Sequence, residues 1–238
     1  GLPSNLQDSL VAYYPFCGNA NDESGNGNDG TVNGATLTSD RFGNANAAYS
    51  FDGFDDYIDI GNSAILNFEN RLTIEAWVYP NSFSNNMKII EQVDSVHKFL
   101  IHQLVILTSG KVSVGLRKEE FLQTYTLSTN TIALNQWSHI VFSWAADQNA
   151  GKGSIYINGT EAAYDTQDVL TSSLWLGVPE STKFGKYLYS PNDPWNGKID
   201  DISIHNRALT STEIQQLYEL GSYDITWSTG DTTSSITV

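Results

Sequence analysis

Short apolar and aromatic runs, each bounded by glycine, asparagine or aspartate, recur along almost the whole of this 238-residue sequence. The clearest run is Arg71–Pro80, where aliphatic side chains alternate with polar or aromatic ones, so that the pattern has a period of two residues. One face carries Leu72, Ile74, Ala76 and Val78, and the other carries Thr73, Glu75, Trp77 and Tyr79. This period is typical of a half-buried β-strand, whose apolar face packs against the core.

Similar runs predict about a dozen short strands in all, a number typical of sandwiches and jelly rolls. Beyond 71–80, we expect strands at 10–16, 31–37, 47–51, 57–60, 87–92, 98–107, 111–117, 137–144, 153–158, 161–164, 173–178 and 197–206. The turn at 108–110 predicts a hairpin between the two strands that flank it. The lack of crossover helices excludes a parallel α/β fold. The sequence therefore predicts an all-β, two-sheet antiparallel jelly-roll sandwich.

One short helix is predicted near the end of this domain, at 211–220. Thr210 and Glu213 have the spacing of a capping box, and Gly221 follows as the residue that ends the helix. We expect one domain over 6–221, with 222–238 as a linker or the start of a following β module. The segment 179–196 reads as a long loop, which inside a compact domain is usually functional.

Composition narrows the possible partners. The 27 acidic residues outnumber the 12 basic ones and give a formal net charge of −15, which disfavours binding to nucleic acid. No apolar run approaches the ~18 residues of a membrane helix, so no membrane insertion is expected. Cys17 is the single cysteine and cannot form an internal disulfide. This near absence of cysteine is compatible with the cytoplasm or with bacterial export.

An ordered series of motifs resembles the laminin-G-like jelly-roll domains of the concanavalin A-like lectin/glucanase superfamily. These motifs lie at 10–16, 22–30, 49–53, 56–58, 72–78, 136–141, 155–159 and 197–209. The resemblance implies a carbohydrate-binding or adhesion module of a secreted or cell-surface, multidomain bacterial protein, often with a structural calcium ion. The tail around Trp227 resembles the start of an immunoglobulin-like repeat.

Two segments suggest where calcium would bind. The loop 19–30 is rich in oxygen donors and glycines, which suit Ca²⁺, although taken alone such a loop is also an ordinary polar turn. Strand alternation places Asp200 on the face of Ile202 and Ile204, where a buried carboxylate needs a cation or several donors. The resemblance implies that Asp22 and Asp200 share a calcium site. Further candidate ligands are Asn26, Gly27 and Asn28.

Other carboxylates have less specific roles. Asp52 and Asp56 could add ligands or stabilise their own turn. A retaining glycosidase needs two carboxylates about 5 to 5.5 Å apart, and the Glu-x-Asp-x-Glu strand of laminarinase-like relatives is absent. His102 and Gln103 resemble an alginate-lyase set only superficially, and no Gly-x-Ser-x-Gly elbow occurs. We therefore expect no enzyme activity, with a glycan-degrading enzyme as the more remote alternative.

An aromatic segment inside 179–196 is the candidate carbohydrate site. Sugar binding needs aromatic rings for stacking and polar groups for hydroxyls. The candidate residues are Tyr187, Tyr189, Asn192, Asp193 and Trp195. For Trp195 the competing interpretation is that its ring closes the end of the sandwich. The expected partner is a polysaccharide or cell-surface glycan, and the alternative is a protein-binding, adhesion or spacer module without glycan affinity.

Overall fold

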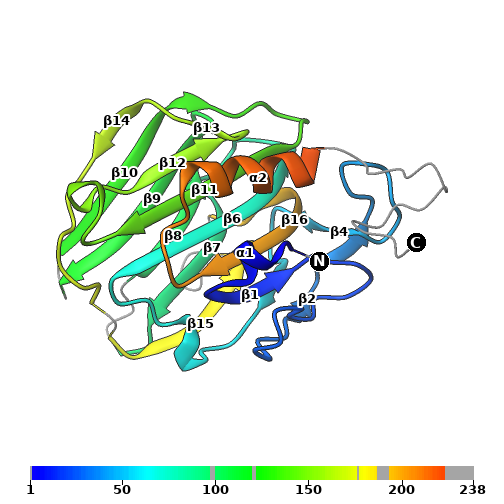
Figure 1. Cartoon of the computed structure of the whole chain (residues 1–238). Helices are drawn as coiled ribbons and strands as arrows, with labels where there is room; N and C mark the ends of the chain where they lie inside the picture. Colours follow the sequence, from blue (N-terminus) through cyan, green and yellow to red (C-terminus); the bar gives the residue numbers. More distant parts are fainter. Residues whose placement is uncertain (1, 97–99, 120–121, 176, 187–192, 223–238) are drawn as a thin grey trace, which may run out of the picture.

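The computed structural model describes residues 2–96, 100–119, 122–175, 177–186 and 193–222. This part of the chain forms two eight-stranded sheets in which all strand pairs are antiparallel (Figure 1). Sheet A has the order β13-β12-β11-β6-β16-β4-β3, with β1 also paired to β16. Sheet B has the order β14-β10-β9-β8-β7-β15-β5-β2. The predicted jelly-roll sandwich is confirmed.

The elements have the following bounds. Sheet A contains β1 (Leu10–Tyr14), β3 (Thr36–Thr38), β4 (Ala48–Asp52), β6 (Arg71–Pro80), β11 (Ser138–Ala145), β12 (Ser154–Ile157), β13 (Thr160–Glu161) and β16 (Asn196–His205). Sheet B contains β2 (Thr31–Asn33), β5 (Tyr57–Asp59), β7 (Met87–Asp94), β8 (Leu100–Ile106), β9 (Lys111–Glu119), β10 (Leu122–Thr131), β14 (Tyr164–Gln167) and β15 (Pro179–Phe184). The helices are α1 (Ser4–Gln7) and α2 (Ser211–Ser222), with 3-10 turns at Ala64–Leu66 and Asn149–Gly151.

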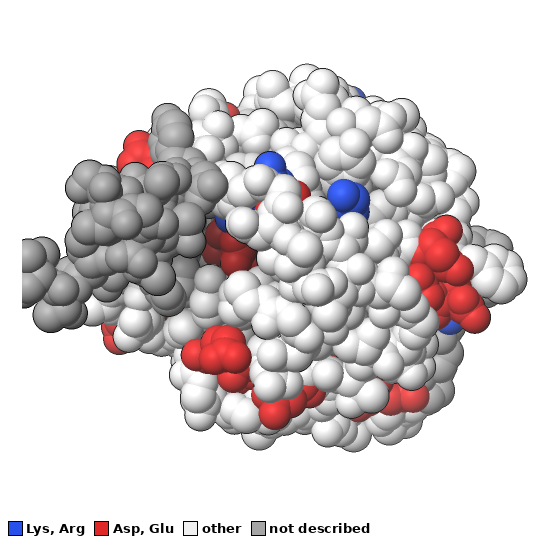
Figure 2. All heavy atoms as spheres, turned by 90° about the vertical axis from the view of Figure 1, so that its right-hand side faces the viewer, with Lys and Arg blue, Asp and Glu red and all other residues white. Residues whose placement is uncertain are grey.

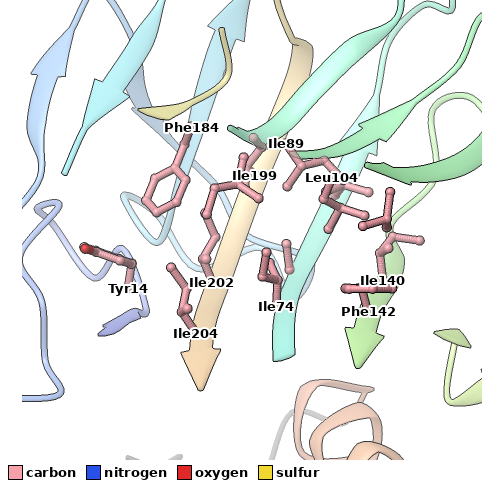
Figure 3. Packing of buried hydrophobic residues seen from close by; sticks show 14 of the residues in the cluster. Tyr14, Ile74, Ile89, Leu104, Ile140, Phe142, Phe184, Ile199, Ile202 and Ile204 are labelled. Atoms are coloured by element: carbon pink, nitrogen blue, oxygen red, sulfur yellow. The ribbon is translucent and has the colours of Figure 1, made fainter. Parts of the chain in front are cut away.

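The hydrophobic core fills the space between the inner faces of the two sheets (Figure 3). Ile74, Ile140 and Phe142 of sheet A belong to the same buried cluster as Leu104 and Phe184 of sheet B. The alternation predicted for 71–80 is correct, because Leu72, Ile74, Ala76 and Val78 all lie in this cluster. The opposite face of β6 is turned away from the core.

A β-bulge in β16 changes the predicted alternation. The register with β6 shifts between Asp200 and Ser203, and Asp201 has a φ of 43°. The extra residue allows Ile199, Ile202 and Ile204 all to enter the core. The prediction that Asp200 shares a face with Ile202 and Ile204 is therefore wrong. The bulge places both aspartates on the outer face of sheet A.

Helix α2 lies across that outer face (Figure 1), where Ile214 and Leu217 pack with Leu6 of α1 and with Val141 and Tyr156 of the sheet. The predicted capping box is confirmed. The Thr210 backbone N–H donates to Glu213 Oε2 at 2.8 Å, and the Glu213 N–H donates to Thr210 Oγ1 at 3.3 Å. The helix continues to Ser222, past the glycine expected to end it.

Two predicted strands differ in the structure. The run 31–37 divides at Gly34, with β2 in sheet B and β3 in sheet A. Gly34 has a φ of 79°, and a Cβ there would lie 2.0 Å from Asp56 Oδ1, so only glycine fits this crossing. The run 173–178 is not a strand in its described residues. Instead β15, inside the predicted long loop, completes sheet B between β7 and β5.

Candidate functional site

Asp22 organises the loop that follows β1. Its Oδ1 accepts the backbone N–H groups of Tyr13 at 3.0 Å and Ser24 at 2.9 Å. Its Oδ2 accepts the backbone N–H of Asn28 at 3.0 Å and the Asn28 side-chain amide at 3.2 Å. Burial alone would raise the pKa of Asp22, but hydrogen bonds from Ser24, Tyr13 and Asn28 lower it. Four N–H donors thus surround this carboxylate.

The other candidate calcium ligands of this loop also have partners within the protein. The Asn26 amide donates to the backbone oxygens of Leu10 and Val11, each at 3.0 Å. The backbone oxygen of Asn28 accepts the Tyr14 hydroxyl at 2.6 Å. In contrast, Asn28 Oδ1 is buried without a hydrogen-bond partner. This oxygen is therefore free to accept a water molecule or a cation.

Asp200 has a different partner from the one predicted. Its Oδ2 lies 2.7 Å from Nη1 of Arg41, and the side chains of Asp200 and Arg41 are only 3% and 9% exposed. Burial and the neighbouring Asp201 raise the pKa of Asp200, and Arg41 opposes this rise. The carboxylate of Asp22 bonds to β1 and to its own loop, whereas that of Asp200 bonds to Arg41 and Asp201, so the two carboxylates share no hydrogen-bond partner. The donor set expected to hold one calcium ion between them does not fit these contacts.

A third acidic group lies between β4 and β5. Carboxylate oxygens of Asp52, Asp55 and Asp56 lie within 4.8 Å of one another, the one such group that the described residues form. Asp52 Oδ1 accepts the N–H of Phe54 at 2.7 Å, and Asp56 Oδ2 accepts the N–H of Asp52 at 2.9 Å. These bonds fit the turn-stabilising alternative. Carboxylates also form several separate patches on the face shown in Figure 2.

The aromatic segment predicted to bind sugar is divided by the structure. Tyr187, Tyr189 and Asn192 lie outside the described residues. Trp195 is 0% exposed and belongs to the central core, so its prediction as a sugar-stacking ring is wrong and it has a packing role instead. Asp193 lies on the outer side of sheet B, where its carboxylate is 3.8 Å from Nζ of Lys88.

That outer face carries a group of polar side chains that sequence reasoning missed. Glu91, Gln103, Gly115 and Tyr125 are register partners across β7, β8, β9 and β10. Gly115 leaves a gap in this row. A Cβ at Gly115 would lie 2.4 Å from Nε2 of Gln123 and 3.0 Å from Nε2 of Gln103, so the two amides converge above the glycine.

Neighbouring side chains hold the two amides in place. Lys88 Nζ donates to Gln103 Oε1 at 2.6 Å, and the Tyr125 hydroxyl donates to Gln123 Oε1 at 2.9 Å. Burial lowers the pKa of Lys88, which Glu91 and Asp193 oppose. We call Lys88, Glu91, Gln103, Gln123 and Tyr125 the amide cluster. Its alternating strand positions place it on the face opposite the core.

Aromatic surface borders the amide cluster. The ring of Tyr125 is 42% exposed on β10. Nearby, the guanidinium carbon of Arg117 lies 5.9 Å from the ring centre of Trp175, and Arg117 is the register partner of Gln123. The arrangement offers hydrogen-bonding amides beside an accessible ring, which are the two features that sugar recognition needs. In the sequence, the one hint was a glycine in the middle of a strand.

Known proteins share both the sequence pattern and the fold of this chain. A family model described as the concanavalin A-like lectin/glucanases superfamily matches residues 51–215. Domain 4 of AbnA, an extracellular arabinanase of Geobacillus stearothermophilus solved with arabinotriose, is similar with a TM-score of 0.63 and 20% identity. The similarity covers 88% of this chain and 98% of that domain.

Two other solved structures share the fold at lower identity. The binding domain of botulinum neurotoxin DC, in complex with rat synaptotagmin II, has a TM-score of 0.65 and 16% identity over 92% of this chain and 53% of that one. A Trypanosoma rangeli sialidase, solved as a covalent intermediate with a difluorosialic acid, has a TM-score of 0.64 and 16% identity over 89% of this chain and 32% of the sialidase. The sequence matches no curated protein. In the described residues, no helix has both the length and the apolarity to cross a membrane.

Proposed function

Because this chain belongs to the laminin-G-like domains of the concanavalin A-like lectin/glucanase superfamily, we propose that it is a carbohydrate-binding module that binds glycan on the outer face of sheet B. The observation that carries this proposal is the convergence of the Gln103 and Gln123 amides above Gly115, beside the exposed ring of Tyr125. The arabinanase domain solved with arabinotriose supports it by analogy of fold.

The chemistry of the amide cluster fits a neutral glycan. Amide groups donate to and accept from hydroxyls, and a tyrosine ring can stack on the apolar face of a sugar. Lys88 is balanced by Glu91 and Asp193, so the described part of this face has no excess of positive charge for carboxylated sugars. The net charge of −15 also disfavours the binding of carboxylated sugars. Tyr187, Tyr189 and Asn192 stay predictions for a second part of this site.

We propose further that the module is not catalytic. The amide cluster contains one carboxylate, that of Glu91, whereas a retaining glycosidase needs two. The sequence also lacks the strand that carries both carboxylates in laminarinase-like relatives. Because a sialidase shares the fold, this part of the proposal needs its own test. Release of reducing ends from any glycan that binds would contradict it.

The test of glycan binding combines an array of neutral and acidic oligosaccharides with calorimetry on the glycans that bind. Gln123→Ala removes one amide, and each lost hydrogen bond of about 1 kcal/mol lowers affinity roughly fivefold. Gly115→Val fills the gap and should lower affinity at least as much. Gln215→Ala is the matched control, because that amide lies on α2 and bonds Glu219 at 3.0 Å. Equal affinities for all four proteins would contradict the proposed site.

A protein partner is the second candidate, supported by the toxin binding domain that was solved with synaptotagmin II. Under this alternative the protein would give no signal on the array, and an adhesion or spacer role would follow. We also propose a secreted or cell-surface location, which the extracellular arabinanase domain supports.

A structural calcium ion stays a proposal for the N-terminal loop alone. The support is the unpartnered Asn28 Oδ1, since the carboxylate of Asp22 already accepts four N–H donors. Thermal melts with EDTA and with calcium restored, on the wild type and on Asn28→Ala, test it. A calcium-dependent rise in Tm that Asn28→Ala abolishes is expected. Identical melts would remove the proposal.

A further inference from the structure

Arg41, in the loop between β3 and β4, uses all three nitrogens of its guanidinium. Nη1 lies 2.7 Å from Asp200 Oδ2, and Nη2 lies 2.6 Å from Asp201 Oδ2. Nε donates to the backbone oxygen of Gly221 in α2. The side chain therefore joins three segments that are far apart in the sequence: the β3–β4 loop, the bulge of β16 and the C-terminal end of α2.

Two aromatic rings also contact this guanidinium. Its central carbon lies 4.7 Å from the ring centre of Phe42 and 4.6 Å from that of Trp77. Trp77 in turn stacks on Tyr218 of α2, with ring centres 5.9 Å apart. Cation–π contacts of this kind are strongest when the cation is desolvated, and the Arg41 side chain is only 9% exposed. These contacts form a cation site built by the protein itself.

The oxygens of the two carboxylates that face Arg41 all have hydrogen-bond partners. Asp200 Oδ1 accepts the N–H of Asp201 at 2.8 Å, and Asp201 Oδ1 accepts the Tyr13 hydroxyl at 3.3 Å. The remaining oxygen of each carboxylate is bound to Arg41. All four carboxylate oxygens therefore have a donor from the protein. A metal ion would have to displace one of these donors before it could bind.

We propose that Arg41 is the resident structural cation at Asp200 and Asp201, in place of the calcium ion that the resemblance implies there. The guanidinium stabilises the bulge of β16 and fixes the end of α2 against β6. Because arginine keeps its charge over the whole physiological pH range, this part of the fold is independent of divalent cations. The proposal does not depend on glycan binding, so neither result decides the other.

The test is the thermal unfolding of Arg41→Ala with and without millimolar calcium. Removal of one partner from a buried ion pair leaves two unpaired carboxylates, and we expect Tm to fall by roughly 10 °C. Calcium should restore part of this loss, because the freed carboxylates become available oxygen ligands. The added substitutions Asp200→Asn and Asp201→Asn should abolish the restored part. Arg71→Ala is the control, since Arg71 pairs with Asp147 at an exposed site and should shift Tm by about 2 °C or less.

Two results would overturn the proposal. One is an Arg41→Ala protein that melts like Arg71→Ala. The other is a wild-type protein whose calcium binding, measured by calorimetry and elemental analysis, is lost in Asp200→Asn. If Arg41→Ala does not fold, Arg41→Lys keeps the charge but loses the planar group that contacts both carboxylates at once. Its Tm should lie below that of the wild type and should rise with calcium by more than the wild-type value, and an unchanged Tm would contradict the role of the guanidinium.

Discussion

The ammonium of Lys88 donates to Oε1 of Gln103 at 2.6 Å, and this contact sets the direction of the Gln103 amide. Lysine can only donate, so the carbonyl end of the amide faces β7 and the amino end faces Gln123 above Gly115. The amide cluster is thus oriented by a residue one strand away.

Lys88→Met is expected to weaken glycan binding without unfolding the protein. Methionine keeps most of the buried volume but cannot hold the Gln103 carbonyl, so the amide gains alternative rotamers and affinity falls roughly fivefold. Calorimetry with a glycan that binds the wild type measures this loss. Lys111→Met is the control, because Lys111 pairs with Asp165 away from the cluster. A Lys88→Met protein with wild-type affinity would show that the Gln103 orientation is irrelevant to binding.

Asp22→Asn is expected to destabilise the fold by about 1 to 3 kcal/mol, because asparagine offers one acceptor oxygen where the carboxylate offers two. The backbone N–H groups of Tyr13, Ser24 and Asn28 would then compete for it. Urea unfolding followed by tryptophan fluorescence gives the free energy. Glu23→Gln is the adjacent control, with an expected change near zero. Equal losses in the two variants would contradict the organising role of Asp22.

Stability should fall as the pH drops from about 6.5 to about 4, the interval between the ordinary pKa of histidine and the value in this fold. Burial lowers the pKa values of His102 and His205 to about 4. Both histidines therefore stay neutral in the folded protein above about pH 4. The unfolded chain takes up protons below pH 6.5, which stabilises the unfolded state relative to the folded state. Two such groups give a slope of up to about 2.7 kcal/mol per pH unit.

Urea unfolding at several pH values between 7.5 and 4 measures this slope. His102→Leu should reduce it by about one proton, or about 1.4 kcal/mol per pH unit. Leucine is compatible with the site, since His102 is buried beside Phe68 with ring centres 5.7 Å apart. An unchanged slope would mean that folding does not lower the pKa of His102.

Trp195→Ala is expected to cost about 3 to 5 kcal/mol, because the ring is fully buried and its removal leaves a cavity. Phe54→Ala, at a ring that is 75% exposed, should change stability by less than about 0.5 kcal/mol. Thermal melts distinguish the two. A stable Trp195→Ala protein that has lost glycan affinity would instead restore the sugar-stacking interpretation of Trp195.

Local patterns predicted those parts of the fold that local physics determines. The alternation of β6, the hairpin of β8 and β9 and the capping box of α2 each depend on residues within one or two elements. The bulge in β16 does not, because one extra residue reverses the faces and its aspartates are held by Arg41, about 160 positions earlier in the sequence. Alternation alone could not show this.

The amide cluster could not be predicted from the sequence for a related reason. Its residues come from four strands, and only the register of sheet B brings Gln103, Gly115 and Tyr125 into one row. The aromatic segment around Trp195 was a conspicuous pattern in the sequence, yet the burial of that ring depends on how the segment returns to the core. Of the two candidate residues in the described part of this segment, Asp193 contacts the amide cluster through Lys88, whereas Trp195 lies in the core.

The positions of the two helices determine how the domain is oriented when it is fused or immobilised at either flank. Asn5 of α1 donates to Gln216 of α2 at 2.9 Å, so both helices pack together on the outer side of sheet A. The amide cluster lies on the outer side of sheet B, at the opposite surface of the sandwich. A fusion partner, a biotin tag or a bead coupled at either flank of the described domain would therefore be directed away from the cluster. Immobilised by either end, the domain would present the amide cluster to the solution.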